Sequence, residues 1–270
     1  MTPPDRRQFI QDRLEQAGTC SYEELAAASH VSTMTIRRDL EEMVRQGRVI
    51  RTVGGVQRAH APSYLYETAV HSRLGQQRDA KRAIARRALG LVTGRPTVFL
   101  DGSTTCLELA RLLAAERKGL TLVTNSVLAC MELGKNSDLS VTGLGGHYDA
   151  GSLCYVGPQA EDAAKTLFVD LAFVSTKGFL PAKGTFESSL PNFRIKQIIA
   201  RQCVELVLLV DHSKFGQRAL SRVLETGQIH TVVTDRPPRR ADLTLLEKAG
   251  CRVLVADGPK PAAHHAAHAA

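Results

Sequence analysis

The stretch YEELAAASHVSTMTIRRDLEEMVRQGRVIR, residues 22–51, decides the fold of the amino-terminal part of the chain. Ser21 precedes it and Glu24 lies three residues after that serine, which is the capping-box pattern at the start of a helix. A turn is expected near His30, and Ser32 is placed to cap a second helix. The pattern therefore predicts two helices joined by a tight turn.

The second of these helices is amphipathic. Ile36, Leu40 and Met43 are spaced i, i+4 and i+7, so they are expected to share one buried face. At about 100° per residue Arg38 falls on the opposite side, and Gly47 is expected to end the helix. Arginine binds guanine or phosphate, and threonine bonds a base or a phosphate, so the outward face suits the major groove of DNA.

Residues 49–56, VIRTVGGV, predict a small β-hairpin with a glycine turn. A hairpin beside a recognition helix forms a wing, from which Arg51 and Arg58 are expected to reach the phosphate backbone or the minor groove. The alternative is a surface helix on which i,i+4 pairs such as Glu41–Arg45 only keep the chain in solution. The residues expected to contact DNA are Ser32, Thr33, Met34, Thr35, Arg37, Arg38, Arg51, Gly54, Gly55 and Arg58.

The composition permits a nucleic acid as partner. The chain has 35 Lys and Arg against 27 Asp and Glu, a net charge of +8 with a pI near 9.4. The position of the charges is more informative, because residues 37–58 hold six arginines and three acids. With 270 residues and 43% apolar side chains, the chain has room for one small and one medium globular domain.

Six cysteines occur without a C-x-x-C pair, and most lie in apolar runs. This pattern predicts free thiols in a reducing cytoplasm rather than a zinc site or a disulfide framework. No signal peptide and no long apolar span are present, so a cytoplasmic protein with no membrane partner is expected. The three histidines of the HHAAH tail lack a fixed scaffold, and neither a metal nor another cofactor is expected.

From Pro96 onward, short apolar runs end in polar turns and lead into helical patterns. This rhythm predicts an α/β domain with a mostly parallel sheet. In such a sheet ligands bind beyond the carboxyl ends of the strands. The expected strands are residues 97–100, 120–123, 139–141, 171–174, 206–210, 231–233 and 252–255.

The turns after these strands collect groups that suit an anion. The hydroxyl-rich turn 102–105 heads a helix, where free N–H groups and the helix dipole favour negative charge, and Lys177 and Lys214 add positive charges. The turn alone is equally an ordinary helix cap, but convergence from several strands favours a phosphate with a polyhydroxylated body. Asp101 either bonds sugar hydroxyls or holds the turn. The residues expected to contact this effector are Asp101, Gly102, Ser103, Thr104, Thr105, Thr124, Asn125, Gly145, Gly146, Lys177, Gly178 and Lys214.

The run HVSTMTIRRDLEEMVRQGRVIRTVGGV, residues 30–56, resembles the winged helix-turn-helix of the DeoR family of bacterial repressors. That family's signature is V-S-x-x-T-I-R-R-D-L, followed by a glycine and R-x-x-G-G. Further blocks resemble its sensor domain, so that the resemblance covers about residues 5–255. These blocks are LDGSTTCLELARLL, LTLVTNS, GLGG, DLAFVSTKG and LLVDHSKFG.

The resemblance implies a sensor domain with the fold of ribose-5-phosphate isomerase and glucosamine-6-phosphate deaminase. It implies a DNA-binding regulator, expected to repress carbohydrate catabolism genes. Such a regulator would bind double-stranded operator DNA as a homo-oligomer, a dimer or a tetramer. A small phosphorylated sugar or polyol would release it.

One segment departs from the family pattern. Many relatives carry a glutamate a few residues before the helix lysine that matches Lys196, and here Asn192 stands about where that acid is expected. Arg194 or Lys196 then reads an anionic group of the effector, or both are exposed helix charges.

The alternative function is a bifunctional enzyme, a sugar-phosphate isomerase fused to a DNA-binding module. The resembling isomerases place several carboxylates at the end of the strand that aligns with residues 170–175. Here Asp170 stands at the start of that strand, and Glu187 and Asp211 are the nearby substitutes. Enediol chemistry needs a positioned base, so a non-enzymatic sensor is the preferred interpretation.

The expected domain boundaries follow from these patterns. They are 1–58 for the winged helix-turn-helix (helix-turn-helix about 20–39, wing about 48–58), 59–70 for a linker, 71–258 for the α/β effector-sensing domain and 259–270 for a disordered tail.

Overall fold

A computed structural model describes residues 1–256 except 18, 47, 53 and 59–69. Within these residues the chain forms two compact units, each described by itself. The first comprises Met1–Arg78 with Ala150–Ser152, and the second comprises Asp79–Asp149 and the residues from Leu153 onward. Gly47, the linker positions 59–69 and the tail 259–270 lie outside the described residues.

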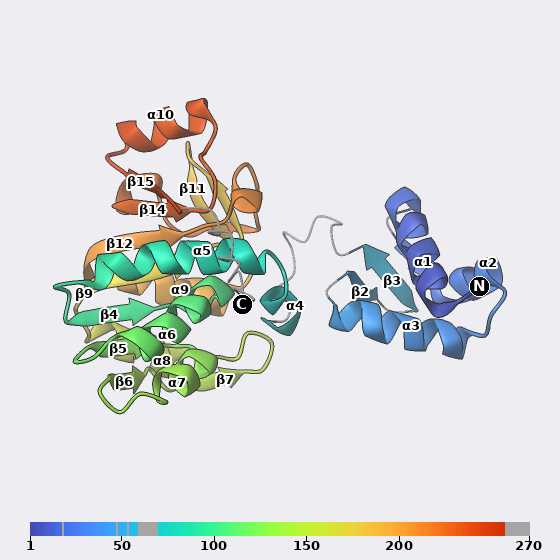
Figure 1. Ribbon diagram of the computed structural model, residues 1–270, viewed down its shortest axis with the longest axis horizontal. Helices are drawn as coiled ribbons and strands as arrows, with labels where there is room; N and C mark the ends of the chain where they lie inside the picture. Colours follow the sequence, from blue (N-terminus) through green and yellow to red (C-terminus); the bar gives the residue numbers. More distant parts are fainter. Residues whose placement is uncertain (18, 47, 53, 59–69, 257–270) are drawn as a thin grey trace, which may run out of the picture. The chain divides into compact units, whose positions relative to one another are not determined.

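The first unit is a winged helix-turn-helix, as predicted. Its three strands form an antiparallel sheet in the order β1-β3-β2, of which β1 was not expected from the sequence. Its elements, most of which are labelled in Figure 1, are α1 (Pro3–Ala17), β1 (Thr19–Ser21), α2 (Tyr22–Ser29), α3 (Thr33–Arg45), β2 (Val49–Thr52), β3 (Gly55–Arg58) and α4 (Val70–Leu74).

The predicted caps of the helix-turn-helix are confirmed. The Ser21 hydroxyl accepts a hydrogen bond from the Glu24 amide at 3.1 Å, and the Glu24 carboxylate accepts one from the Ser21 amide at 2.7 Å. His30 takes the left-handed conformation at φ 54°, which ends α2. Ser32 then caps α3 by accepting a bond from the Thr35 amide at 3.2 Å. One inner amide at the start of each helix, that of Glu24 or Thr35, thereby gains an acceptor.

The core of this unit lies under α3. Ile36, Leu40 and Met43 are fully buried, as their spacing predicts, and they pack with Ile10 of α1 and Leu25 of α2. Burial of such side chains stabilises the unit by roughly 1.5–3 kcal/mol each. The opposite face of α3 is therefore exposed to solvent.

The second unit is an α/β domain around a seven-stranded sheet, as predicted. The strand order is β15-β14-β12-β9-β4-β5-β6, and every neighbouring pair is parallel. The sheet strands are β4 (Thr97–Leu100), β5 (Thr121–Thr124), β6 (Ser140–Gly143), β9 (Val169–Ser175), β12 (Cys203–Leu209), β14 (Thr231–Thr234) and β15 (Arg252–Val255).

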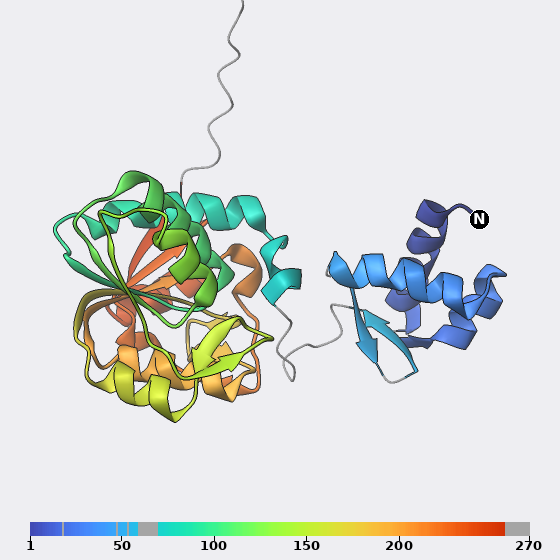
Figure 2. The ribbon, with the colours of Figure 1, turned by 90° about the horizontal axis from the view of Figure 1, so that it is seen from below.

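Helices cover both faces of this sheet (Figure 2). Side chains alternate along each strand, so that Val98 packs into one apolar core and Phe99 into the other. The helices of the first core are α5 (Arg78–Leu89), α6 (Thr104–Glu116) and α7 (Val127–Leu133), and those of the second are α8 (Pro158–Lys165), α9 (Leu190–Ile199) and α10 (Arg240–Lys248).

Short antiparallel β-strands, which were not predicted from the sequence, form two small sheets in addition to the seven-stranded one. They are β7 (His147–Asp149) with β8 (Cys154–Val156), and β10 (Gly178–Leu180) with β11 (Gly184–Glu187) and β13 (Ser221–Arg222). Strands of two to four residues carry too little periodicity to be distinguished from loops. Among the described residues, no helix is both long and apolar enough to cross a membrane.

The connections create a switch point in the middle of the sheet. The chain runs from β4 to β5 and β6 in one direction, and from β9 to β12, β14 and β15 in the other. In open α/β sheets the ligand crevice lies at such a reversal, outside the carboxyl ends of the strands. We call this side of the sheet the carboxyl edge.

A substitution at Gly102 tests how tightly the carboxyl edge is packed. A Cβ at Gly102 would lie 2.1 Å from the Cys154 sulfur. We expect Gly102→Ala to destabilise the protein by about 1–3 kcal/mol through overpacking. Urea unfolding measures this loss, and repeating it in a Cys154→Ala background should recover most of the Gly102→Ala loss. An equal loss in both backgrounds would contradict the contact.

Candidate functional site

The outward face of α3 presents the side chains that the sequence assigned to DNA. Thr33, Arg37 and Arg38 are exposed, Met34 is 67% exposed and Thr35 is half-buried. The Arg37 guanidinium lies 5.1 Å from the centroid of the Tyr22 ring at the start of α2. This cation–π contact restricts the arginine without removing it from the surface.

A buried acid anchors α3 to α1. Asp39 is 5% exposed and its carboxylate binds the Arg6 guanidinium, with Arg7 at 3.5 Å from the other oxygen. An open groove of about 420 Å³ lies between the start of α1 and α3, lined by these arginines together with Arg38 and Arg45. The acid therefore fixes the recognition helix against its support while arginines remain along its flank.

The wing is shaped by glycines and a surface ion pair. Gly54 has φ 83°, and its carbonyl accepts a bond from the Tyr22 amide at 3.1 Å. A Cβ at Gly55 would lie 2.3 Å from the Cys20 carbonyl oxygen, so only glycine fits there. Arg51 binds Glu41 of α3 at 3.2 Å.

Two details of the expected surface differ in the structure. Arg45 binds Glu42, three residues away, rather than Glu41, because Glu41 faces the wing arginine. The side chain of Arg58 lies outside what the structure describes, although its backbone belongs to β3.

At the carboxyl edge, the turn after β4 forms the start of α6. Ser103 caps the helix by accepting a bond from the Cys106 amide at 3.1 Å. The Ser103 amide donates to Asp101 Oδ1 at 2.9 Å, which closes the turn. The amides of Thr104 and Thr105 follow the cap in the first turn of the helix, where intrahelical acceptors are missing. The two threonine side chains are buried.

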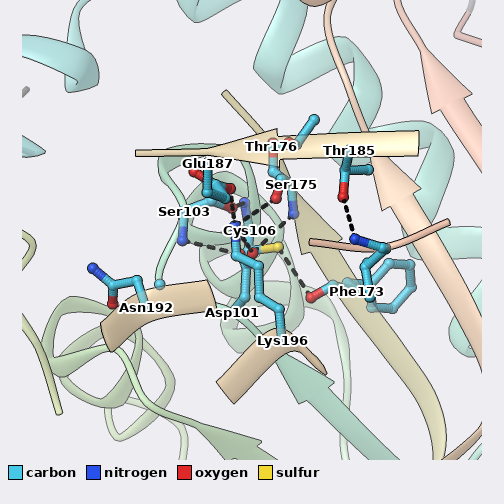
Figure 3. A network of polar contacts seen from close by, with 12 residues as sticks. Asp101, Ser103, Cys106, Phe173, Ser175, Thr176, Thr185, Glu187, Asn192 and Lys196 are labelled. Atoms are coloured by element: carbon cyan, nitrogen blue, oxygen red, sulfur yellow. Dashed lines mark hydrogen bonds and ion pairs between the residues drawn. The ribbon is translucent and has the colours of Figure 1, made fainter. Parts of the chain in front are cut away.

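A buried lysine joins the strands at the switch point (Figure 3). Lys196 of α9 is 9% exposed, so its interpretation as an exposed helix charge was wrong. Its ammonium donates to the Ser175 carbonyl at 2.6 Å and to the Glu187 carboxylate, and it lies 3.2 Å from Asp101 Oδ2. Asp101 Oδ2 also accepts the Ser175 amide at 2.9 Å. Both oxygens of Asp101 are thus engaged within the protein, in support of its role in holding the turn.

The charges in this cluster stabilise one another. Burial alone would raise the pKa of Asp101, but Lys196 and the bonds from Ser103 and Ser175 outweigh it, and the pKa is lowered. Burial alone would lower the pKa of Lys196, but Glu187 and Asp101 outweigh it, and the pKa is raised. The lysine and Asp101 are therefore both ionised at neutral pH.

Asn125 follows β5, is 2% exposed and has its Nδ2 3.7 Å from where a Cβ of Gly102 would stand. Its Oδ1 is buried and has no hydrogen-bond partner among the residues that the structure describes. Thr124 is fully buried, and its hydroxyl accepts a hydrogen bond from the Ser126 amide at 3.0 Å. Thr124 therefore holds the turn. Buried polar atoms without partners are uncommon and indicate a missing water or ligand.

The two other such atoms among the described residues are Ser188 Oγ and Thr234 Oγ1. Thr234 ends β14 at the carboxyl edge, and Ser188 follows Glu187. Of these three atoms, Asn125 Oδ1 is the one whose side chain also lies near Gly102 at the start of α6.

The two loop lysines stand on neighbouring segments. Gly178 follows Lys177, and a Cβ there would lie 2.6 Å from the Gln217 carbonyl oxygen. Phe179 forms a parallel bridge with Phe215, the residue after Lys214. Gly178 thus allows the two loops to approach.

The remaining expected positions lie near the start of α8. Gly145 has φ 68°, and Gly146 has φ 108° and lies against Ala160 of α8. Both glycines supply backbone conformations that other residues adopt rarely.

The sequence reading missed a histidine–carboxylate pair at the same edge. The His212 amide and Nδ1 both bind the Asp235 carboxylate, each at 2.7 Å. Their separation of 23 residues gave no local signal, although both follow sheet strands. Among the described residues no cluster of three or more His, Cys, Asp or Glu is arranged to hold a metal ion.

Two family models match the chain. The DeoR-like helix-turn-helix domain matches residues 6–61, and the DeoR C terminal sensor domain matches residues 76–236. HTH-type transcriptional regulator YgbI of Escherichia coli strain K12 is 32% identical over 95% of this chain and 99% of its own length. The glycerol-3-phosphate regulon repressor of the same strain is 29% identical over 88% of this chain and 93% of its own.

A solved structure of ribose 5-phosphate isomerase A from Methanocaldococcus jannaschii is also similar. It has 19% sequence identity and a TM-score of 0.39, covering 52% of this chain and 55% of that one.

Removal of the buried ammonium tests the cluster around Lys196. We expect Lys196→Met to cost about 3–5 kcal/mol at pH 7, because two buried carboxylates lose their counter-charge. In the wild type, the contribution of Asp101 is present above its unfolded pKa and is lost as pH falls through the lower folded value. In the variant, protonation instead relieves the unpaired acids, so the difference in unfolding free energy should shrink towards pH 4.

Denaturant unfolding from pH 4 to 8 measures this difference. Lys183→Met, which changes an exposed lysine, is the matched control and should cost little at any pH. A loss for Lys196→Met that stays constant with pH would contradict the role of the ion pairs.

Proposed function

Because the chain belongs to the DeoR family of DNA-binding transcriptional regulators, we propose that it represses carbohydrate-utilisation genes and leaves its operator when a phosphorylated sugar or polyol binds. The observation that supports the effector part is the carboxyl edge, where α6 begins, where Lys177 and Lys214 follow the ends of β9 and β12, and where the Asn125 side-chain oxygen is buried without a hydrogen-bond partner among the described residues. The glycerol-3-phosphate regulon repressor, whose name connects it with a polyol phosphate, supports the same class of effector.

In this proposal α3 enters the major groove and the wing contacts the backbone. The exposed arginines and threonines of α3 read bases or phosphates, and Met34 contacts an apolar base edge such as a thymine methyl group. Ser32 and the wing glycines position these groups through the cap and the turn. One such module reads few base pairs, so pairing of half-sites through a dimer or tetramer is part of the proposal.

The effector is proposed to bind at the start of α6. Its phosphate accepts hydrogen bonds from the amides of Gly102, Thr104 and Thr105, aided by the helix dipole, while the Ser103 amide stays on Asp101 and Lys177 and Lys214 add charge. Gly145, Gly146 and Gly178 shape the loops around it. Asp101 and Thr124 hold the turns, because their polar atoms already bind the protein.

We infer a sensor rather than an isomerase from the engagement of the carboxylates. Asp101 and Glu187 bind Lys196, and Asp211 accepts the Ser213 amide at 3.0 Å. Asp170, at the start of β9, accepts the Thr97 amide at 3.0 Å. A general base needs an accessible carboxylate beside the substrate, and these four acids are committed to structural bonds.

Release from the operator requires only a modest coupling between the two ligands. A difference of about 1–3 kcal/mol between effector-bound and effector-free states changes operator affinity about 5–150-fold. By reciprocity, operator DNA weakens effector binding by the same factor, so the two affinities can be measured against each other.

Arg38→Ala tests the DNA-binding face. We expect operator affinity to fall at least about fivefold, or about 1 kcal/mol, because one contact to a base or phosphate is removed. Gel-shift titration of a genomic promoter fragment measures this change. Arg201→Ala, an exposed arginine of the second unit, is the control and should bind as the wild type does. Unchanged affinity of Arg38→Ala would remove the assignment of α3.

The double variant Lys177→Ala/Lys214→Ala tests the effector site. We expect the effector concentration needed for half-release of the operator to rise at least about tenfold, which corresponds to about 1.4 kcal/mol, while operator affinity without effector stays constant. The effector is first found by a thermal-shift screen with sugar and polyol phosphates. Unaltered release in the double variant would contradict the phosphate position.

A further inference from the structure

The carbonyl oxygen of the Asn125 side chain is the most specific ligand-reading group at the carboxyl edge. It is buried, and no group of the described residues donates to it. A buried acceptor without a donor costs free energy that a ligand donor recovers. The side chain is therefore poised for a partner from outside the protein.

The carboxamide is fixed in this orientation. Its Nδ2 donates to the Tyr155 carbonyl at 3.4 Å, so a flipped amide would bring two carbonyl oxygens together. The backbone is fixed as well, because the Tyr155 amide donates to the Asn125 carbonyl at 2.7 Å and the Val127 amide donates to the Leu153 carbonyl at 3.0 Å. An antiparallel bridge between Ser126 and Cys154 lies between these two bonds.

The same segment places Asn125 beside the start of α6. Gly102 lies against the Cys154 sulfur, and a Cβ there would stand 3.7 Å from Asn125 Nδ2. Gly102 immediately precedes the Ser103 cap. The unpartnered oxygen thus belongs to the neighbourhood in which the helix offers free amides to a phosphate.

A phosphate alone does not complete this site, because a dianion brings acceptors and Asn125 Oδ1 needs a donor. An ammonium group would supply one but is disfavoured beside the positive end of the α6 dipole. A hydroxyl group is neutral and donates one hydrogen bond.

On the premise of the proposed function, we propose that Asn125 accepts a hydrogen bond from a hydroxyl group of the effector, and that the site selects polyol or sugar phosphates over phosphate esters without hydroxyls. Sites built to bond a ligand hydroxyl reject analogues that lack it, since the buried polar group is then left unpaired. Asn125 is therefore the specificity-determining residue, whereas the helix start supplies affinity for the anion.

Matched ligand pairs test this proposal on the full-length protein. The pairs are glycerol 3-phosphate with n-propyl phosphate, and D-glucitol 6-phosphate with n-hexyl phosphate, and inorganic phosphate is a fifth ligand. Dissociation constants come from calorimetry. We expect at least one polyol phosphate to bind the wild type at least tenfold tighter than its alkyl partner.

Asn125→Leu should lower that preference at least fivefold while the affinities for the alkyl phosphate and inorganic phosphate stay within twofold. Asn125→Ala, which adds no bulk, gives the same readout if the leucine variant does not fold. Asn136→Leu is the control, because Asn136 donates to two backbone carbonyls, those of Ala114 and Arg117. It should cost stability and leave the preference unchanged.

The outcomes separate the two proposals. Equal binding of both members of each pair by the wild type, or an unchanged preference in the Asn125 variants, overturns the hydroxyl contact and leaves the anion site standing. Equal loss of all ligands in the Asn125 variants also overturns it, since the residue then has a general structural role. Failure of every phosphate to bind the wild type removes the proposed effector site and this inference together.

Discussion

The sensor unit depends on the burial of one ammonium group. The side chain of Lys196 extends from α9 to the switch point of the sheet, where its ammonium contacts Glu187, Asp101 and the Ser175 carbonyl. A buried charge persists only when it is paired and hydrogen-bonded, so this lysine requires all three partners at once. The partners belong to β9, β11 and the turn after β4, and their relative positions are therefore fixed before any ligand arrives.

This constraint divides the charges of the carboxyl edge into two classes. In the cluster around Lys196 the ammonium is already paired with carboxylates of the protein, so the cluster offers no free positive charge to an anion. In the proposed site, attraction for the anion comes from the first amides of α6 and from Lys177 and Lys214 on the loops. The fixed cluster sets the position of the turn, and the turn sets the position of the amides. Selectivity is then left to neutral groups such as the Asn125 carboxamide.

The sequence was sufficient to predict those parts of the structure that follow from short-range patterns of apolar residues. The i, i+4, i+7 spacing of Ile36, Leu40 and Met43 specified the buried face of α3, and apolar runs specified all seven sheet strands, because both patterns follow from local geometry. The pair Glu187 and Lys196 gave no such signal, since a lysine on a short helix usually faces solvent. The burial of Lys196 depends on Asp101, which is 95 residues away in the sequence. Only the parallel pairing of β4 with β9 brings Asp101 near the lysine.

The starts of α3 and α6, one in each unit, are built in the same way. A helix start that is to meet a phosphate must keep its first amides free and must not move. In α3 and α6 a serine outside the helix, Ser32 or Ser103, satisfies one inner amide, which leaves the outer ones available. A buried acid then anchors each helix: Asp39, in the middle of α3, binds Arg6 of the supporting helix, and Asp101, just before α6, binds the Ser103 amide and Lys196. In the proposed function, operator phosphates and an effector phosphate therefore meet the same kind of local structure, and the side chains around each helix start decide which anion binds there.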